Sequence, residues 1–298
     1  MSDTLPEPDC VPGALHPRDT KHLIGQDAAE ASFLEAYNTG RLHHGWLMIG
    51  PRGTGKATLA YRIARFLLSQ PMDDGGMFGA PQKPTSLETD PKHPVARRIA
   101  AGADPSLFVL RRGGAGSTES DQKKNLEAGK FAKDIRVDDV RKLNGFFNFS
   151  SAEGGRRVVI VDAADEMNVQ AANALLKRLE EPPENATLLL ISHQSSRLLP
   201  TIRSRCQLIR LIQLSAEDMQ SVLQRLPAEV DQEAVKQGLM QPELVAMAGG
   251  SPGALLGHVR QWLRVSPELI GRLHSLPTQP IEALALARDL TEALDGEQ

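Results

Sequence analysis

The chain has 298 residues, of which 41% are hydrophobic and 24% charged, and its formal net charge is -3. This composition is ordinary for a globular protein and argues against tight, non-specific DNA binding by the chain alone, which needs a surplus of Lys and Arg. No apolar run could span a membrane and no signal-peptide stretch is present, so we expect a cytoplasmic protein. Two cysteines and eight histidines without metal-ligand spacing predict no metal site and no disulfide framework.

The first part of the chain predicts a leader, then alternating helices and strands. Residues 1–20 contain four prolines and are expected to form a flexible leader. Residues 113–130 are rich in Gly, Ser and charge, and are expected to form a flexible surface insertion. Apolar spacing predicts helices at 26–38, 56–70 and 95–101, and strands at 46–49 and 107–110.

The rest of the chain continues the alternation and then becomes helical. We expect helices at 137–147 and 169–181 and strands at 158–161, 188–191 and 208–211. Continuously apolar strands that alternate with helices predict an α/β fold with a parallel five-stranded sheet covered on both faces. Ser215 is expected to cap the first helix of a small helical lid domain. The predicted boundaries are 21–213 for the α/β domain, 214–275 for the lid, and 276–298 for the start of a further helical region.

A phosphate-binding loop follows the first predicted strand. Backbone N–H groups of a G-x-x-x-x-G-K loop cradle phosphates, and its lysine reaches the outer oxygens. The residues expected to contact nucleotide are Gly50, Gly53, Thr54, Gly55 and Lys56. Ala57 stands where Ser or Thr normally holds Mg²⁺, and Thr58 is rotated by roughly 100° around the helix. Two interpretations stay open: weak binding of ATP or ADP, or a glycine-rich turn that binds nothing.

Two further polar residues follow predicted strands. Asp162 ends a buried strand, where a carboxylate can hold a metal-bound water, but Ala163 replaces the acid that normally orients the attacking water. The alternative role for Asp162 is a turn or helix-cap residue. Ser192 ends the next strand, where it could sense a terminal phosphate, or it is a solvated loop serine. We therefore expect weak or no ATP hydrolysis.

The run Ser204-Arg205-Cys206 carries an arginine that can act outside its own chain. Arginine is planar, always charged and bidentate, so Arg205 could stabilise charge on a phosphate held by a neighbouring subunit. Its small neighbours allow a second protein to approach closely. The alternative is a surface arginine in a salt bridge.

These residues together resemble the clamp-loader ATPases of bacterial DNA polymerase III, an AAA+ family, over residues 23–257. The stretches that carry the resemblance are LIGQ at 23–26, RLHH at 41–44, the loop at 50–56, ANALLK at 172–177, LEEPP at 179–183 and SRC at 204–206. The run 173–183 together with SRC is highly specific, whereas a phosphate loop alone would not be. The resemblance implies an AAA+ domain followed by a helical lid.

Within that family, three departures favour a non-hydrolysing subunit over the motor. They are Ala57, Ala163, and Gly253 where motor subunits carry an arginine that senses nucleotide. The resemblance then implies that Arg205 serves the ATP site of an adjacent motor (gamma/tau) subunit. It also implies a delta subunit as partner, and the sliding clamp and primed DNA as partners through the complex. The chain would lack ATPase activity of its own but belong to the DNA-directed DNA polymerase holoenzyme, a nucleotidyltransferase complex.

Two other family features are expected to be missing. The family often carries a four-cysteine zinc module, but residues 69–104 contain no cysteine, so zinc is not expected. The family's helical collar would need more chain than follows Pro267. Two alternative functions remain: a self-sufficient AAA+ ATPase that uses Thr58 and Asp165 or Glu166, and a structural module that binds nucleotide permanently through Lys56.

Overall fold

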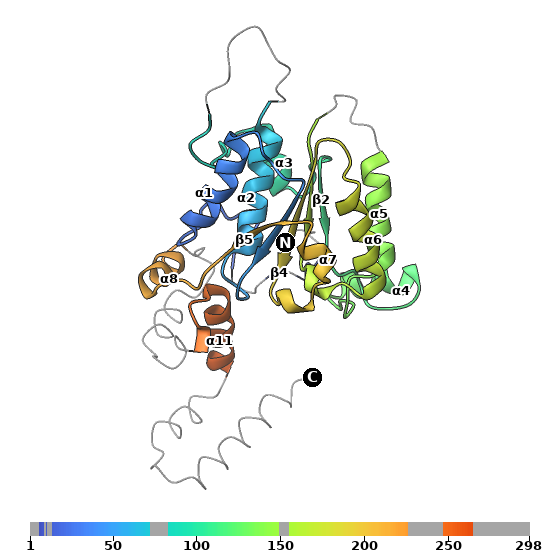
Figure 1. Cartoon of the computed structure of the whole chain (residues 1–298). Helices are drawn as coiled ribbons and strands as arrows, with labels where there is room; N and C mark the ends of the chain where they lie inside the picture. Colours follow the sequence, from blue (N-terminus) through green and yellow to red (C-terminus); the bar gives the residue numbers. More distant parts are fainter. Residues whose placement is uncertain are drawn as a thin grey trace.

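One parallel sheet forms the centre of the α/β domain (Figure 1). The computed structural model describes residues 6–8, 10, 14–71, 83–148, 155–225 and 247–264. The strands are β1 (Gly45–Ile49), β2 (Leu107–Leu110), β3 (Arg157–Val161), β4 (Ala186–Ser192) and β5 (Gln207–Arg210). They lie in the order β2-β3-β4-β1-β5, and Trp46 of β1 pairs with Leu189 of β4 and Gln207 of β5. The predicted parallel five-stranded sheet is confirmed.

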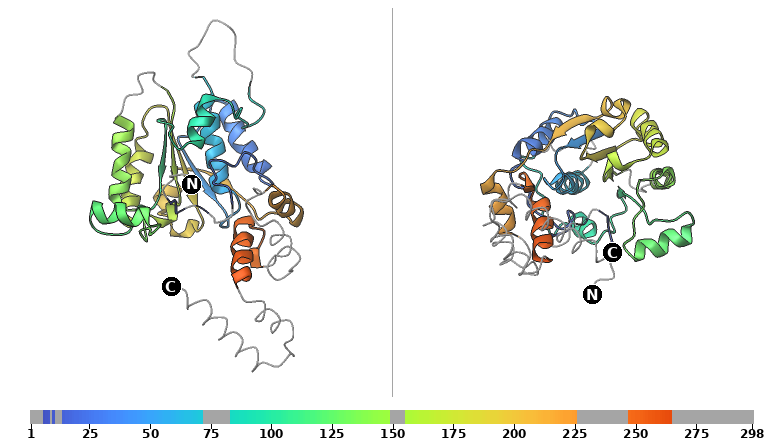
Figure 2. Two further views of the ribbon diagram at one scale, coloured as in Figure 1. Left: turned by 180° about the vertical axis from the view of Figure 1, so that it is seen from behind. Right: turned by 90° about the horizontal axis from the view of Figure 1, so that it is seen from below.

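Helices cover both faces of this sheet, which Figure 2 shows from behind and from below. Successive side chains of a strand point to opposite faces, so Met48 joins one core and Leu47 the other. The first core contains residues of α1 (Asp27–Asn38), α2 (Lys56–Ser69) and α3 (Pro94–Ala100). The second contains residues of α5 (Val137–Asn148), α6 (Val169–Glu180) and the short α7 (Pro200–Arg203). Because both of their faces are buried, the inner strands β1, β3 and β4 are mostly apolar, whereas the edge strand β5 is exposed at Gln207, Leu208 and Arg210.

Local capping explains where several helices begin. The Asn168 side chain accepts a hydrogen bond from the Ala171 N–H at 2.8 Å, and α6 starts at this point. Ser215 accepts from the Asp218 N–H at 3.1 Å at the start of α8 (Ala216–Leu223), so the predicted cap is confirmed. Two short 3-10 helices, η1 (Ala164–Glu166) and η2 (Ser195–Arg197), and helix α7 were not predicted, because each is too short to show a periodic apolar pattern.

The segment at 113–130 differs from the expected flexible insertion. It contains α4 (Glu119–Glu127), which Thr118 caps by accepting from the Asp121 N–H at 3.1 Å. The Asn125 side-chain amide donates to the Ala115 carbonyl at 2.8 Å, which folds the segment back on itself. This helix has no buried residue, so it lacks the apolar stripe by which a helix is recognised in a sequence.

The described part of the expected flexible leader also lies against the domain. Arg65 of α2 donates to the Arg18 carbonyl at 2.8 Å and to the Thr20 carbonyl at 3.0 Å. Glu7 pairs with Arg111 at 2.7 Å and with Arg18. Burial alone would raise the pKa of Glu7, but hydrogen bonds from His16 and the two arginines hold that pKa well below its usual range. Several residues between 14 and 20 also line one cavity together with the phosphate loop.

The described lid consists of α8 and α11 (Pro252–Arg264), which share a small core. That core is made of Leu214, Met219, Leu223, Ala248, Leu255 and Leu256. The predicted end of the lid and the further helical region at 276–298 lie outside the described residues, and the domain boundaries stay predictions. Within the described ranges, none of the helices combines the length and apolar character needed to cross a bilayer.

Candidate functional site

The phosphate loop connects β1 to α2, as the sequence predicts, and lies against the lid. Gly53 has a φ of +77°, and a Cβ there would lie 2.3 Å from the Ser251 hydroxyl oxygen. Only glycine adopts this conformation without strain and leaves room for the lid. The Ser251 hydroxyl donates to the Arg52 carbonyl at 2.7 Å and accepts from the Ala254 N–H at 3.1 Å. Sequence reasoning noted Gly253 in this stretch but missed Ser251.

Lys56 is turned back onto its own loop. Its ammonium group donates to the carbonyl oxygens of Gly50, at 2.8 Å, and of Pro51. The residue is only 3% exposed. Burial lowers the pKa of Lys56 to about 8, against the opposing effect of the nearby Asp162 and Asp165. The lysine that would bind a phosphate is therefore already held by carbonyl oxygens.

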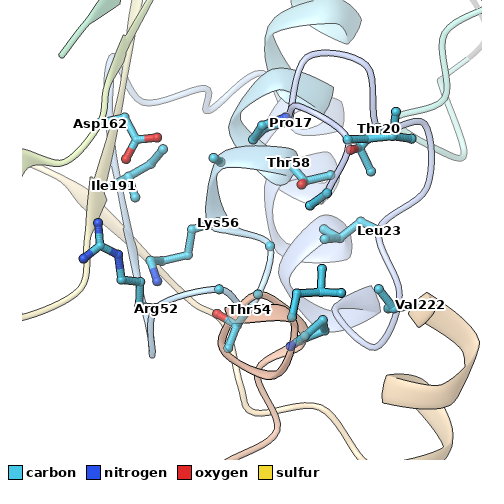
Figure 3. Close-up of a pocket in the computed structure, with 18 of the residues that line it drawn as sticks. Pro17, Thr20, Leu23, Arg52, Thr54, Lys56, Thr58, Asp162, Ile191 and Val222 are labelled. Atoms are coloured by element: carbon cyan, nitrogen blue, oxygen red, sulfur yellow. The ribbon is translucent and has the colours of Figure 1, made fainter. Parts of the chain in front are cut away.

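A cavity of about 480 Å³ opens beside the loop (Figure 3). Its size falls within the usual range for small-molecule sites. Lys56 and Asp162 lie on one side, and apolar side chains that include Leu23 and Val222 of the lid lie on the other. Thr58 lies on the side of Thr20 and Leu23, away from Asp162. The cavity wall therefore has a polar half and an apolar half. Its residues do not fit Mg²⁺, because no residue with a hydroxyl group follows Lys56 directly.

The two acids after Asp162 already have partners. The Asp165 carboxylate accepts from the backbone N–H groups of His193, at 3.0 Å, and of Gln194, at 3.1 Å. Glu166 pairs with Arg112 at 2.8 Å. Asp165 thus holds the loop after β4 in place. Neither acid is in a position to replace the one missing at Ala163 without giving up these contacts.

Ser192 and His193, at the end of β4, have different surroundings. Ser192 is fully buried at the end of β4 and is not among the cavity residues, so it is no solvated loop serine either. His193 lines the cavity, together with Ile191. Burial first, and then Lys56, lower the pKa of His193 to about 4. Sequence reasoning missed His193, although alternation along β4 predicts that residues 191 and 193 share a side.

Arg205 and the loop lie at opposite ends of the parallel strands β5 and β1. Arg205 precedes β5, and its carbonyl oxygen would lie 3.2 Å from a Cβ on Gly45, the first residue of β1. Its guanidinium pairs with Glu180 at 2.8 Å and donates to the Thr201 carbonyl at 3.2 Å, with the side chain 38% exposed. Next to it, burial raises the pKa of the Cys206 thiol to about 12. Ser204 is exposed, and its hydroxyl donates to the Thr201 carbonyl at 3.1 Å.

Two family models and a relative at 40% identity point to delta-type subunits of DNA polymerase III. The family model described as DNA polymerase III, delta subunit, matches residues 25–215, and the model described as cyanobacterial DNA polymerase III delta prime, C-terminal domain, matches residues 217–298. DNA polymerase III subunit delta' of Pseudomonas aeruginosa is 40% identical over 210 residues, which are 70% of this chain and 53% of that protein. The chain spans about half the length of the curated relatives it matches.

More distant similarities extend to other subunits of the same polymerase. DNA polymerase III subunit gamma/tau of Mycobacterium tuberculosis is 28% identical over 280 residues, which are 93% of this chain and 43% of that protein. A solved DNA polymerase III gamma subunit-related protein of Thermotoga maritima has a TM-score of 0.40 and 20% identity, over 89% of this chain and 79% of that chain.

Proposed function

This chain belongs to the DNA polymerase III delta-prime subunit family, and on that premise we propose that it is a non-hydrolysing subunit of a clamp loader. In this proposal Arg205 stabilises charge on ATP bound by an adjacent subunit of the gamma/tau type. A delta subunit completes the complex, which loads the sliding clamp on primed DNA in the cytoplasm. Ser204 and Cys206 belong to the surface that meets the neighbour.

The observation that carries this proposal is the separation of Arg205 from its own phosphate loop. Arg205 lies beside Gly45 at the start of β1, whereas the loop begins after Ile49 at the end of that strand. Four residue steps of a strand span about 13 Å. An arginine placed at this end of the strands cannot serve the loop of its own chain, but its partly exposed guanidinium can reach a phosphate held by another protein.

The chain's own loop supports the non-hydrolysing part of the proposal. Asp162 borders the cavity, but its neighbour Ala163 has no acidic group, and Ala57 has no hydroxyl for Mg²⁺. Lys56 is engaged by the carbonyl oxygens of Gly50 and Pro51. The groups that would take over in a self-sufficient ATPase, Asp165 and Glu166, are held by other contacts.

The test of this proposal is ATP turnover in a complex reconstituted from this chain and its delta and gamma/tau partners. Replacing Arg205 by Ala should leave the fold intact and lower turnover by about 10³-fold or more, the usual effect of losing an arginine finger. Arg203→Ala is a matched control, because this exposed arginine lies two residues away and contacts the Ser195 carbonyl at 3.5 Å. Unchanged turnover in the Arg205 variant would refute the proposed role.

The isolated chain tests the alternative function. We expect no ATP turnover with Mg²⁺, even at high protein concentration. Turnover that disappears in the Lys56→Ala variant would show that the chain is an ATPase in its own right.

A further inference from the structure

The Arg205 side chain is held by two oxygen atoms from two different elements. Nη2 pairs with Oε1 of Glu180, the last residue of α6, at 2.8 Å. Nη1 donates to the carbonyl of Thr201 in α7 at 3.2 Å. A guanidinium has five N–H donors in a rigid plane, and these contacts use two of them. The plane is therefore oriented while other N–H groups remain for a phosphate.

The end of α6, which carries Glu180, is anchored against the start of β1. The ring of His44 contacts the carbonyl of Leu179 through Nε2 at 2.9 Å, which ties the end of α6 to the residue before β1. A carbonyl oxygen only accepts, so Nε2 carries the proton of this hydrogen bond, and burial lowers the pKa of His44. Gly45 allows β1 and α6 to approach closely, because a Cβ at this position would lie 2.9 Å from the Leu179 side chain. The carboxylate is thus presented from an anchored helix end.

We propose that Glu180 is the positioning residue of Arg205 and holds its guanidinium in the orientation that a neighbour's phosphate requires. This inference rests on the proposed function of Arg205. An arginine side chain has many rotamers, and ordering it at the moment of reaction costs conformational entropy. A carboxylate that orders it beforehand removes that cost from the transition state.

The energetics separate this role from a structural one. Both side chains are partly exposed, 38% for Arg205 and 43% for Glu180, and such pairs contribute little to stability. Removing the carboxylate should therefore leave the fold and its melting temperature essentially unchanged. Orientation matters far more for a reaction, because a small displacement of a charge-stabilising group costs a large factor in rate. The effect should appear in kcat and not in KM for ATP, since the arginine acts in the transition state.

The experiment uses the reconstituted complex with five variants of this chain, one of them the single Arg205→Ala variant. Glu180→Ala should lower kcat by about 10-fold with an unchanged KM. Glu180→Gln keeps an oxygen acceptor for the guanidinium and should restore most of the rate. Glu184→Ala removes an equal charge from the turn after α6 and should have no effect. In the Arg205→Ala background, Glu180→Ala should cause no further loss, because the residue acts through the arginine.

Each contrary outcome identifies what failed. Wild-type turnover in Arg205→Ala would refute the proposed function itself. A slow Arg205→Ala with a fully active Glu180→Ala would refute only the positioning role. An equal loss from Glu180→Ala with and without Arg205 would show that Glu180 acts elsewhere. Loss of co-elution of Glu180→Ala with the gamma/tau subunit would assign Glu180 to subunit assembly and would also overturn the inference.

Discussion

Ser251 donates its hydroxyl proton to the carbonyl oxygen of Arg52 at 2.7 Å, and this bond joins the lid to the phosphate loop. Ser251 is 3% exposed, and its oxygen also caps α11. The lid helix and the loop therefore share one buried polar atom. This bond connects the lid directly to the loop that also holds Lys56.

Replacing Ser251 by Ala should weaken this connection. The variant loses a helix cap and a buried hydrogen bond, which together should lower the free energy of unfolding of the lid by about 1–2 kcal/mol. Amide hydrogen exchange of residues 50–56 should become faster than in the wild type. Ser204→Ala is a suitable control, because its hydroxyl makes a local bond on an exposed surface. Unchanged exchange in the loop would contradict a coupling through Ser251.

Gly53 offers a test of lid contact that is independent of backbone strain. Ala at Gly53 must adopt a φ of +77° and place its Cβ 2.3 Å from the Ser251 hydroxyl oxygen. Ala at Gly40 must adopt a φ of +68°, but nothing lies within 4 Å of its Cβ. Both variants should lose about 1 kcal/mol from strain, and Gly53→Ala should lose a further 1 kcal/mol or more from the clash. Equal urea-unfolding free energies would show that the lid does not press on Gly53.

The buried Lys56 predicts a pH dependence of stability. Its pKa is about 8 in the folded chain, against 10.5 as the ordinary value. Between these pH values the unfolded chain binds more protons than the folded one, so stability rises with pH. Below pH 8 both states are protonated and the full cost of the buried charge is present.

Comparison with Lys56→Met isolates this effect from other titrating groups. Between pH 8 and pH 10, the unfolding free energy of the wild type should rise relative to that of the variant by roughly 1–3 kcal/mol. Urea denaturation at a series of pH values measures the difference. A constant difference across this range would mean that Lys56 keeps an ordinary pKa.

Much of the fold could be predicted because its strands and larger helices bury apolar faces. The predicted strand at 107–110 agrees with β2, and the predicted helix at 56–70 differs from α2 by one residue. Helix α4 could not be predicted, because it buries no side chain and depends on the Thr118 cap. The packed leader also escaped prediction, since its contacts join Glu7 to Arg111, more than a hundred residues away.

The sequence alone determined which chemical groups the chain has and lacks. Ala57 and Ala163 remove a hydroxyl and a carboxylate from any arrangement of the loop, and the run at 204–206 marks the arginine. Tertiary structure decided what those groups face. In the folded chain, Lys56 contacts carbonyl oxygens of its own loop. His193 rather than Ser192 lines the cavity, and Arg205 pairs with Glu180. The physical reason is that each residue's chemical groups are fixed by its own identity. Its burial and its partners depend on which strand ends and helix ends the packed sheet brings together.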